Sequence, residues 1–326
     1  MENTNVFKED NRLTAPKLLD VVCSNNHFAA NGWEYEIAKK YLYEVNGKML
    51  ELGFYDHYED KSLAKHIKRV LELPTSYDCP MKCAYCASSW IKQDLKLSAD
   101  VLFYITNKVL ENHNILENDS LLIALTGTGD AFFTLDTILD FINLIIKKYN
   151  NFSFTVSSCN WTAEMLNRIE KAANTIEFRN VQATYISHDT KTVFRIIPGL
   201  RRIGFNFTYF LKHVRESKNN FWRINYLLLD SVNSSNDSFN EFVNLIEPVK
   251  EKLIVRISAL NETIASKNSG LRPASLERAV DLRNKIMGIG AHAYLFHSDT
   301  NDNMNCGQLM LESSHRNINI LNNQAV

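Results

Sequence analysis

The chain has 326 residues, of which 45% are hydrophobic, and a formal net charge of -1 at pH 7. This composition is that of a globular protein with room for one large α/β domain and a small appendage. The near-zero charge gives no global attraction to nucleic acid or to an anionic membrane surface, and no apolar run approaches the roughly 20 residues of a membrane span. We therefore expect a cytoplasmic protein, with no membrane partner, whose six cysteines stay reduced.

The two ends of the chain differ in character from its middle. Residues 1–32 are polar and rich in asparagine. Asn46-Gly47 lies between two half-apolar runs, a typical signal for a β-hairpin over residues 34–55. We expect an N-terminal extension over residues 1–60 that contains this short hairpin, and a flexible polar tail over residues 312–326.

Strand and helix signals alternate from about residue 65 onward. Such alternation, with helices of about 10–15 residues, predicts an α/β fold with a parallel sheet. About six units predict a partial (β/α)6 barrel over residues 61–311, with the active site at the C-terminal ends of its strands. The predicted strands are 69–74, 121–125, 152–157, 181–186, 223–229, 252–257 and 291–296, and the predicted helices are 99–110, 134–149, 161–173, 238–249 and 275–287.

Cys79, Cys83 and Cys86 form a C-x3-C-x2-C motif directly after the first strand of this predicted barrel. Iron–sulfur clusters are held by cysteine thiolates, usually four of them. A 4Fe–4S cluster bound by three thiolates keeps one iron open for an exchangeable ligand. Zinc, the alternative, would require a fourth Cys or His near a second pair, and the sequence has none nearby. The motif therefore predicts a 4Fe–4S cluster.

This spacing resembles the radical S-adenosylmethionine (SAM) superfamily, in which SAM chelates the open iron through its amino and carboxylate groups. The resemblance implies SAM as a second cofactor and an external electron donor of the flavodoxin or ferredoxin type. It also implies that the aromatic residue before the third cysteine lies close to the adenine, and that the glycine-rich segment after strand 121–125 receives the SAM amino group. The cofactor-binding candidates on this basis are Tyr85, Gly127, Gly129 and Asp130, with Ser157 and Ser158 at the end of the third strand.

Three further segments resemble the narrower family of the RNA adenine methyltransferases RlmN and Cfr. They are residues 223–233, residues 255–261 and the run Asn-Cys-Gly-Gln-Leu at 305–309, in that order. The resemblance implies that Cys306 is catalytic. One SAM methylates its sulfur, and the methyl carbon, activated by a radical derived from a second SAM, is then added to an sp2 carbon. It also implies that Asn261 contacts the SAM ribose, and it adds His188 to the cofactor-binding candidates, with a structural role as the alternative.

The chain departs from that family seven residues before Cys79. There the family has a second cysteine that resolves the covalent intermediate, and this chain has Glu72. Three explanations are open: Cys23 or Cys159 supplies the thiol, Glu72 acts as a base without disulfide release, or the reaction ends differently. The family's N-terminal RNA-binding module is also almost absent, because only about 35 residues precede the hairpin.

These departures, with the near-zero net charge, favour a small-molecule or nucleotide substrate over RNA. We therefore expect a radical SAM methyltransferase with Cys306 and Glu72 as catalytic residues. An RNA adenine methyltransferase that acts at C2 or C8 is the first alternative. A non-catalytic iron–sulfur or SAM-binding protein is the second.

Overall fold

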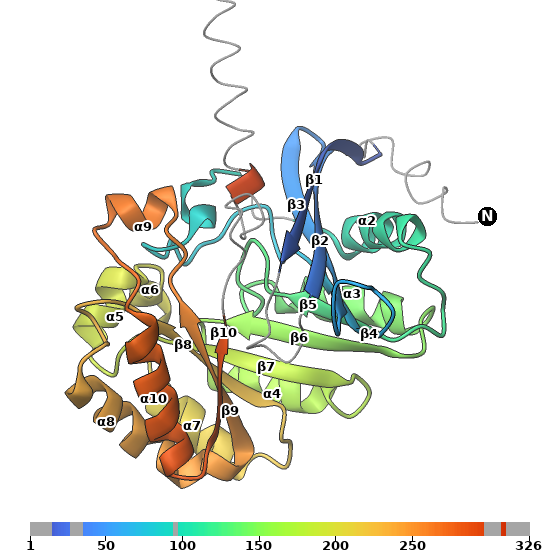
Figure 1. The fold of residues 1–326 in the computed structure, drawn as a ribbon. Coiled ribbons are helices and arrows are strands. Elements are labelled where there is room, and N and C mark those ends of the chain that lie inside the picture. The colour runs from blue at the N-terminus through green and yellow to red at the C-terminus, as the bar shows by residue number, and fades with distance from the viewer. Residues whose placement is uncertain (1–14, 27–34, 94–96, 297–307, 311–326) are drawn as a thin grey trace, which may run out of the picture.

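A computed structural model of the chain describes residues 15–26, 35–93, 97–296 and 308–310. Its described strands form one sheet in which each strand neighbours the next along the chain, with β1 and β10 at the edges (Figure 1). The strands are β1 (Lys17–Asn26), β2 (Tyr35–Val45), β3 (Lys48–Tyr58), β4 (His66–Glu72), β5 (Leu121–Leu125), β6 (Phe152–Ser158), β7 (Phe178–Tyr185), β8 (Trp222–Leu228), β9 (Leu253–Ala259) and β10 (His292–Phe296).

The sheet changes from antiparallel to parallel at β4. Strands β1 to β4 pair antiparallel, and β4 to β10 pair parallel. The predicted hairpin is confirmed: β2 and β3 are joined at Asn46 and Gly47, whose φ angles of 51° and 73° suit a tight two-residue turn. Strand β1 was not predicted, because most of its residues are exposed and carry no hydrophobic alternation.

Helices connect the parallel strands, as the alternation of signals predicted. Each predicted helix is present, and Ser98, for example, caps α2 by accepting a hydrogen bond from the N–H of Val101. The link between β7 and β8 holds three helices that the sequence analysis left undefined. The helical segments are η2 (Ala87–Trp90), α2 (Ala99–Asn112), α3 (Leu135–Ile146), α4 (Ala163–Ala172), α5 (Thr190–Ile196), α6 (Leu200–Ile203), α7 (Phe207–Glu216), α8 (Asn236–Ile246), η3 (Glu247–Lys252), α9 (Ile264–Asn268) and α10 (Leu276–Gly288).

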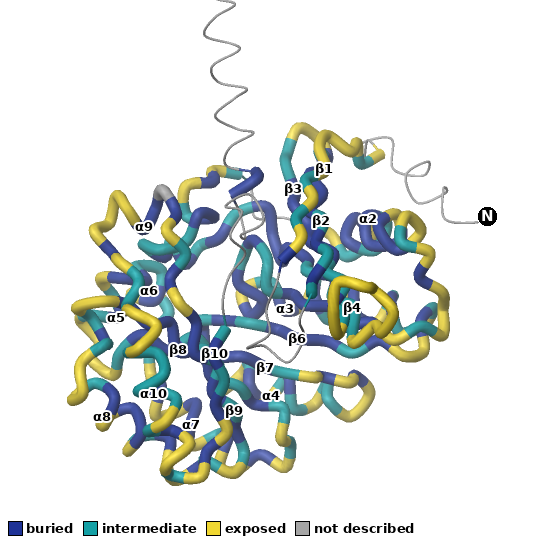
Figure 2. Tube along the Cα trace, in the orientation of Figure 1, coloured by how far each residue is buried: buried dark blue, intermediate teal, exposed yellow. Residues whose placement is uncertain are grey.

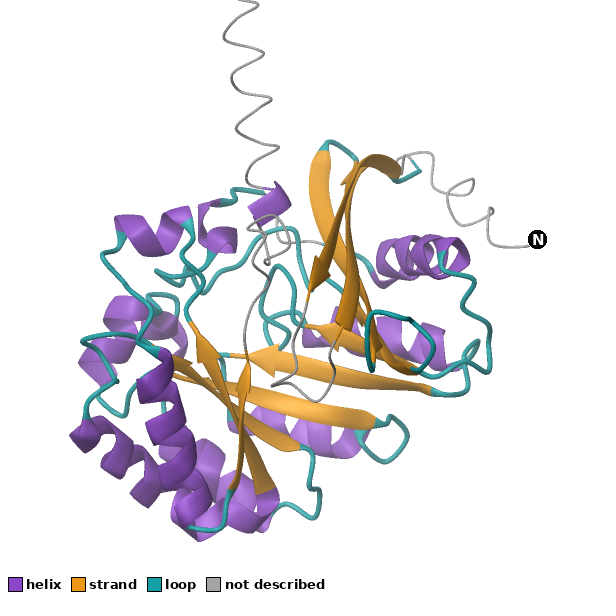
Figure 3. Cartoon of the chain, viewed as in Figure 1, coloured by secondary structure: helices purple, strands orange, loops and turns teal. Residues whose placement is uncertain are grey.

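One face of the sheet, called the outer face here, is covered by helices (Figure 3). Its side chains are apolar: Phe154 and Val156 of β6, Val181 of β7 and Val255 of β9 are fully buried against residues of the surrounding helices. Burying such side chains contributes about 1.5–3 kcal/mol each. The main hydrophobic core therefore lies between the outer face and the helices, where the buried strands of Figure 2 meet the helical shell.

The opposite face, called the inner face here, is polar. Successive residues of a strand point to opposite faces, so the neighbours of the core residues, such as Ser157 and Gln182, share the inner face. This face is concave. Arg256 on β9 and Glu72 on β4 are five strands apart, about 24 Å in a flat sheet. The carboxylate of Glu72 nevertheless acts to raise the pKa of Arg256, because the sheet curves and brings the two side chains closer than a flat sheet would. The predicted fold class, an α/β partial barrel with a hairpin extension, is confirmed, and its sheet is open.

Candidate active site

The loop that carries the three cysteines of the motif follows β4 and is fixed by its backbone. The N–H of Thr75 donates to the carbonyl of Thr128 at 2.7 Å, which ties the start of the loop to the segment after β5. Farther along, the N–H of Ala84 donates to the carbonyl of Ile196 at 2.8 Å. The loop therefore lies beyond the C-terminal ends of the strands, where parallel α/β sheets place their ligands.

Cys79 and Cys83 are buried and Cys86 is half-buried, all within one small apolar cluster. Burial raises the pKa of Cys79 and of Cys86, and the neighbouring thiols raise that of Cys79 further. A hydrogen bond with Cys159, together with burial, raises the pKa of Cys83. Three thiolates in such a place would repel one another unless a cationic group bound them. The donor set and its setting therefore fit an iron–sulfur cluster.

A single metal ion fits this place less well. Within the described ranges, no group of three or more His, Cys, Asp or Glu side chains is arranged to hold one ion. A 4Fe–4S cluster makes a different demand, because each thiolate binds a separate iron at a different corner. Three thiols spread along one loop meet that demand.

Tyr85 and Asn261 come from distant parts of the chain to the same loop. The hydroxyl of Thr263, two residues after Asn261, donates to the carbonyl of Tyr85 at 3.1 Å, and α9 packs beside η2 (Figure 1). Burial, and next the thiol of Cys83, raise the pKa of Tyr85. Both residues therefore stand close to the cysteines, as a cofactor-binding role requires.

Gly127 and Gly129 allow the segment after β5 to approach the start of the cysteine loop. The N–H of Gly127 donates to the carbonyl of Leu73 at 3.0 Å, and a Cβ at Gly127 would lie 2.9 Å from the same oxygen. Gly129 has a φ of 111°, and a Cβ there would collide with Thr75 and Ser76. In these contacts the two glycines allow two segments of the chain to lie close together, and their role toward SAM stays a prediction.

Asp130 is buried, and its carboxylate is hydrogen-bonded to the chain. The Ser158 hydroxyl donates to it at 2.7 Å and the N–H of Cys159 at 2.8 Å, and two N–H groups of the following turn also donate. Burial raises its pKa, and these hydrogen bonds act in the opposite direction. Asp130 and Ser158 together fix Cys159, a link that the sequence did not indicate.

Ser157 and His188 have different surroundings. Ser157 lies on the inner face, where its hydroxyl accepts a hydrogen bond from Gln182 at 3.0 Å. His188 is exposed, and its Nε2 lies 2.9 Å from Glu241 of α8, with both side chains 47% exposed. The structure therefore brings Ser157 to the concave face, and it shows His188 in a surface pair.

Glu72, at the end of β4, belongs to a buried ionic network on the inner face. Its carboxylate accepts hydrogen bonds from Tyr55 at 3.0 Å and from Thr126 at 3.3 Å, and lies 3.7 Å from the Nζ of Lys40. Lys40 is also 2.7 Å from Glu51, and both of these side chains are 1% exposed. The network holds Glu72 in one place, directly before the cysteine loop.

Cys306 lies outside the described residues, but residues 308–310, which follow it closely, are described. Leu309 and Met310 are buried against Leu42 and Ile91. The N–H of Met310 donates to Glu51 at 3.1 Å. The chain next to Cys306 is therefore anchored to the same network that contains Glu72.

The two thiols that could replace the missing family cysteine are placed differently. Cys23 is exposed and pairs in register with Lys39. Because Lys40 faces Glu72, its neighbour Lys39, and with it Cys23, lies on the outer face. Cys159 instead packs among the cysteines of the motif. Of the two, only Cys159 is near the candidate site.

Sequence reasoning missed Lys40, Glu51 and the inner-face residues Arg223 and Arg256. A buried ion pair has no distinct sequence signature, because charged residues on a strand are usually exposed. The two arginines did leave a signal. Strands of a parallel sheet are buried on both faces and read as apolar runs, so the alternating polar residues at Arg223, Asn225 and Arg256 indicate a lined interior.

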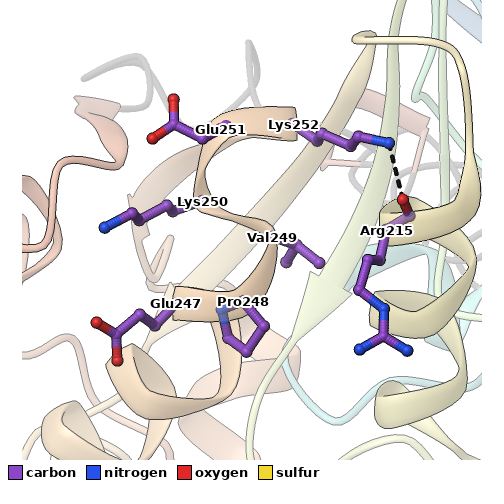
Figure 4. A pocket seen from close by; sticks show the side chains of 7 residues that line it. All are labelled: Arg215, Glu247, Pro248, Val249, Lys250, Glu251 and Lys252. Carbon is purple, nitrogen blue, oxygen red and sulfur yellow. Dashed lines mark hydrogen bonds between the residues drawn. The ribbon is translucent and has the colours of Figure 1, made fainter.

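A separate hollow of about 250 Å³ lies at the other end of the sheet (Figure 4). Arg215 and the residues of η3, directly before β9, line it, and Lys252 closes one side by donating to the carbonyl of Arg215 at 2.7 Å. Since β9 begins there, this hollow is remote from the cysteine loop at the strands' C-terminal ends. We assign it no part in the site.

Sequence comparison gives no relative, whereas structure comparison does. No protein-family model matches the chain, and no curated protein sequence matches it.

None of the described helices is long and apolar enough to cross a membrane.

Among solved structures, the crystal structure of a radical SAM methyltransferase from Sphaerobacter thermophilus matches with a TM-score of 0.69 at 18% identity, covering 90% of this chain and 81% of that one. TYW1 with a lysine-pyruvate adduct matches with a TM-score of 0.46 at 14% identity, over 67% of this chain and 73% of that one. A spore photoproduct lyase variant matches with a TM-score of 0.47 at 12% identity, over 68% and 74%. The first match covers nearly the whole chain, and on it we conclude that the chain has the radical SAM fold.

Proposed function

We propose that the chain is a radical SAM methyltransferase that uses Cys306 as methyl carrier to C-methylate an sp2 carbon of a small molecule or nucleotide. The observation that carries the proposal is the link between Glu72 and the chain next to Cys306. Glu51 accepts the N–H of Met310 and pairs with Lys40, which lies 3.7 Å from Glu72. Cys306, which the family resemblance marks as catalytic, and Glu72, which stands where that family has its second cysteine, thus belong to segments joined by one network.

Cys79, Cys83 and Cys86 are the residues that would hold the cluster. With SAM bound, a 4Fe–4S cluster would supply radical chemistry that can remove hydrogen from an unactivated carbon. Radical chemistry is needed because an electron-poor sp2 carbon is not a nucleophile and cannot be methylated by SAM in a polar reaction. The chain's own part is placement and exclusion of water. The thiols of Cys79 and Cys83 are buried, and Tyr85 and Thr263 close the loop beside them.

Product release requires that the bond between the Cys306 sulfur and the transferred carbon be broken. We assign the second thiol to Cys159. Its thiolate attacks the Cys306 sulfur and a disulfide forms. The carbon leaves with the bonding electron pair and takes up a proton, and the external electron donor reduces the disulfide for the next turnover. The position of Cys159 among the cluster cysteines, held through its N–H by Asp130, supports this role.

The test is the methylation state of Cys306. Enzyme purified without oxygen should contain S-methylcysteine at position 306, seen by mass spectrometry as one added methyl group on its peptide, and labelled SAM should place deuterium there before substrate is added. Cys306→Ala should retain iron and SAM cleavage but should transfer no methyl group. A fully active Cys306→Ala variant whose parent enzyme is never methylated at this position would end the proposal.

A further inference from the structure

Two arginines on the inner face of the sheet are neighbours. Arg256 of β9 pairs in register with Asn225 of β8, and Arg223 precedes Asn225 by two residues, so both arginines point to the same face. Tyr294 of β10 pairs in register with Arg256 on its other side. These three side chains come from three adjacent strands and share the concave side of the partial barrel.

Neither guanidinium has a carboxylate partner in the described part of the chain. Arg223 donates through Nη1 to the Tyr294 hydroxyl at 3.0 Å, and the Cζ of Arg256 lies 3.4 Å from the ring centre of Phe296. The Nε atoms of both arginines are buried and donate to no acceptor among the described residues. The Tyr294 hydroxyl, which accepts from Arg223, still has its own proton to donate.

Such an arrangement is costly for a protein without a ligand. Burial lowers the pKa of Arg256 to about 10, and the charge of Arg223 lowers it further. Buried charges are normally paired, as Lys40 and Glu51 are on the same face. Two adjacent unpaired guanidiniums therefore indicate that an anion completes the site.

We propose that Arg223 and Arg256, with the hydroxyl of Tyr294, bind a phosphate group of the substrate. Two guanidiniums offer two positive charges and forked N–H donors, which match the charge and oxygen geometry of a phosphate dianion better than those of a single carboxylate. Glu72 acts on Arg256, so the anion site faces the strand end that carries Glu72. The inference deepens the proposed function by naming the substrate class: a phosphorylated small molecule or a nucleotide.

The test measures phosphate binding by the cluster-loaded enzyme. Inorganic phosphate is titrated without oxygen at constant ionic strength, and the melting temperature is recorded, because a ligand that binds the folded state raises it in a saturable way. The half-saturating phosphate concentration should rise about tenfold or more in Arg223→Gln and in Arg256→Gln. The control Arg202→Gln, at an exposed position of α6, should match the wild type.

Two further measurements keep the proposal testable if a variant is damaged. Tyr294→Phe keeps the ring, removes one donor, and should weaken phosphate binding by roughly threefold to tenfold. In phosphate-free buffer Arg256→Gln should melt no lower than the wild type, because an unpaired, partly buried charge is gone. A structural role for Arg256 predicts the opposite, a variant that is less stable in every buffer.

The proposal is overturned if phosphate does not stabilise the wild type, if the arginine variants respond to phosphate as it does, or if acetate is as effective as phosphate. None of these outcomes depends on methyl transfer. Cys306→Ala should keep the full phosphate response, so phosphate binding without Cys306 methylation would refute the proposed function alone. Methylated Cys306 without phosphate binding would refute the anion site alone.

Discussion

The two faces of the sheet are made from the same strands and have opposite chemistry. On β6, Val156 of the outer face is fully buried in the apolar core, while its neighbour Ser157 on the inner face is hydrogen-bonded to Gln182. The outer face contains what the fold needs, because buried apolar area is the main stabilising term. The inner face holds buried charges that a core does not need. This difference makes the concave side the better candidate for a functional site.

The strongest test of this division removes the three cysteines of the motif. Replacing Cys79, Cys83 and Cys86 with Ala should abolish cluster binding and SAM cleavage together, while circular dichroism stays native because the main core lies elsewhere. The wild type reconstituted without oxygen should be brown, with about four iron and four sulfide per chain. Cys23→Ala, on the outer face, is the matched control and should keep its iron. Stoichiometric zinc with no iron in the wild type would refute the cluster.

Product release should depend on Cys159, which packs among the cysteines of the motif, and not on Cys23 of the outer face. Cys159→Ser should accumulate a covalent protein–substrate adduct and slow turnover at least about tenfold, because the resolving thiol is lost. Cys23→Ser should behave as the wild type. Mass spectrometry of the intact protein during turnover distinguishes them. An adduct that accumulates in Glu72→Ala but not in Cys159→Ser would move the releasing role to the carboxylate.

Substitutions of two adjacent lysines, one on each face, allow a direct comparison of the faces. Lys40→Met leaves the charge of Glu51 buried with its nearest cation removed and should lower the free energy of unfolding by about 3–5 kcal/mol. Lys39→Met, one residue away on the outer face, should change it by no more than about 0.5 kcal/mol. Urea denaturation gives both values. Equal effects would mean that the ionic network does not distinguish the faces.

The smallest expected effect is a pH dependence at His113, which packs on the outer face of the hairpin. Its ring stacks on Phe54 with centroids 3.6 Å apart, and burial, aided by the charge of Lys39, lowers its pKa from 6.5 to about 4. Between these values the unfolded chain binds a proton that the folded chain does not, so this contribution to stability is lost as the pH falls from 6.5 to 4. His113→Gln should lose less stability across that window in urea titrations. An unchanged slope would contradict this account.

The sequence predicted the elements whose signals are local. Short apolar runs located β5 and β6 to within a residue, and Asn46-Gly47 located the hairpin turn. The C-x3-C-x2-C motif identified its loop for the same reason, since the spacing of the cysteines is itself the signal. Strand β1 was not predicted, because its short apolar patch over residues 18–23 is interrupted by Asp20 and shows no alternation.

The parts that were missed depend on contacts between distant segments. Nothing in the sequence pairs Lys40 with Glu51 and Glu72. Nor does it show that the carboxylate of Asp130 accepts hydrogen bonds from the hydroxyl of Ser158 and the N–H of Cys159. Arg223 was part of a motif that supported a resemblance, but only the three-dimensional structure shows that no carboxylate of the described residues pairs with it. The cofactor roles of Tyr85 and Asn261 and the catalytic role of Cys306 stay predictions.

The hydrogen bond from Met310 to Glu51 spans 259 positions of the chain, and it sets an order of assembly. During synthesis the hairpin that carries Lys40 and Glu51 emerges early and can pair at once, because its contacts are local. The contact between Glu51 and Met310 can form only after residue 310 has been synthesised. A ribosome that stops short of residue 308 therefore releases a chain that contains every described strand, but whose candidate site lacks the anchor of residues 308–310.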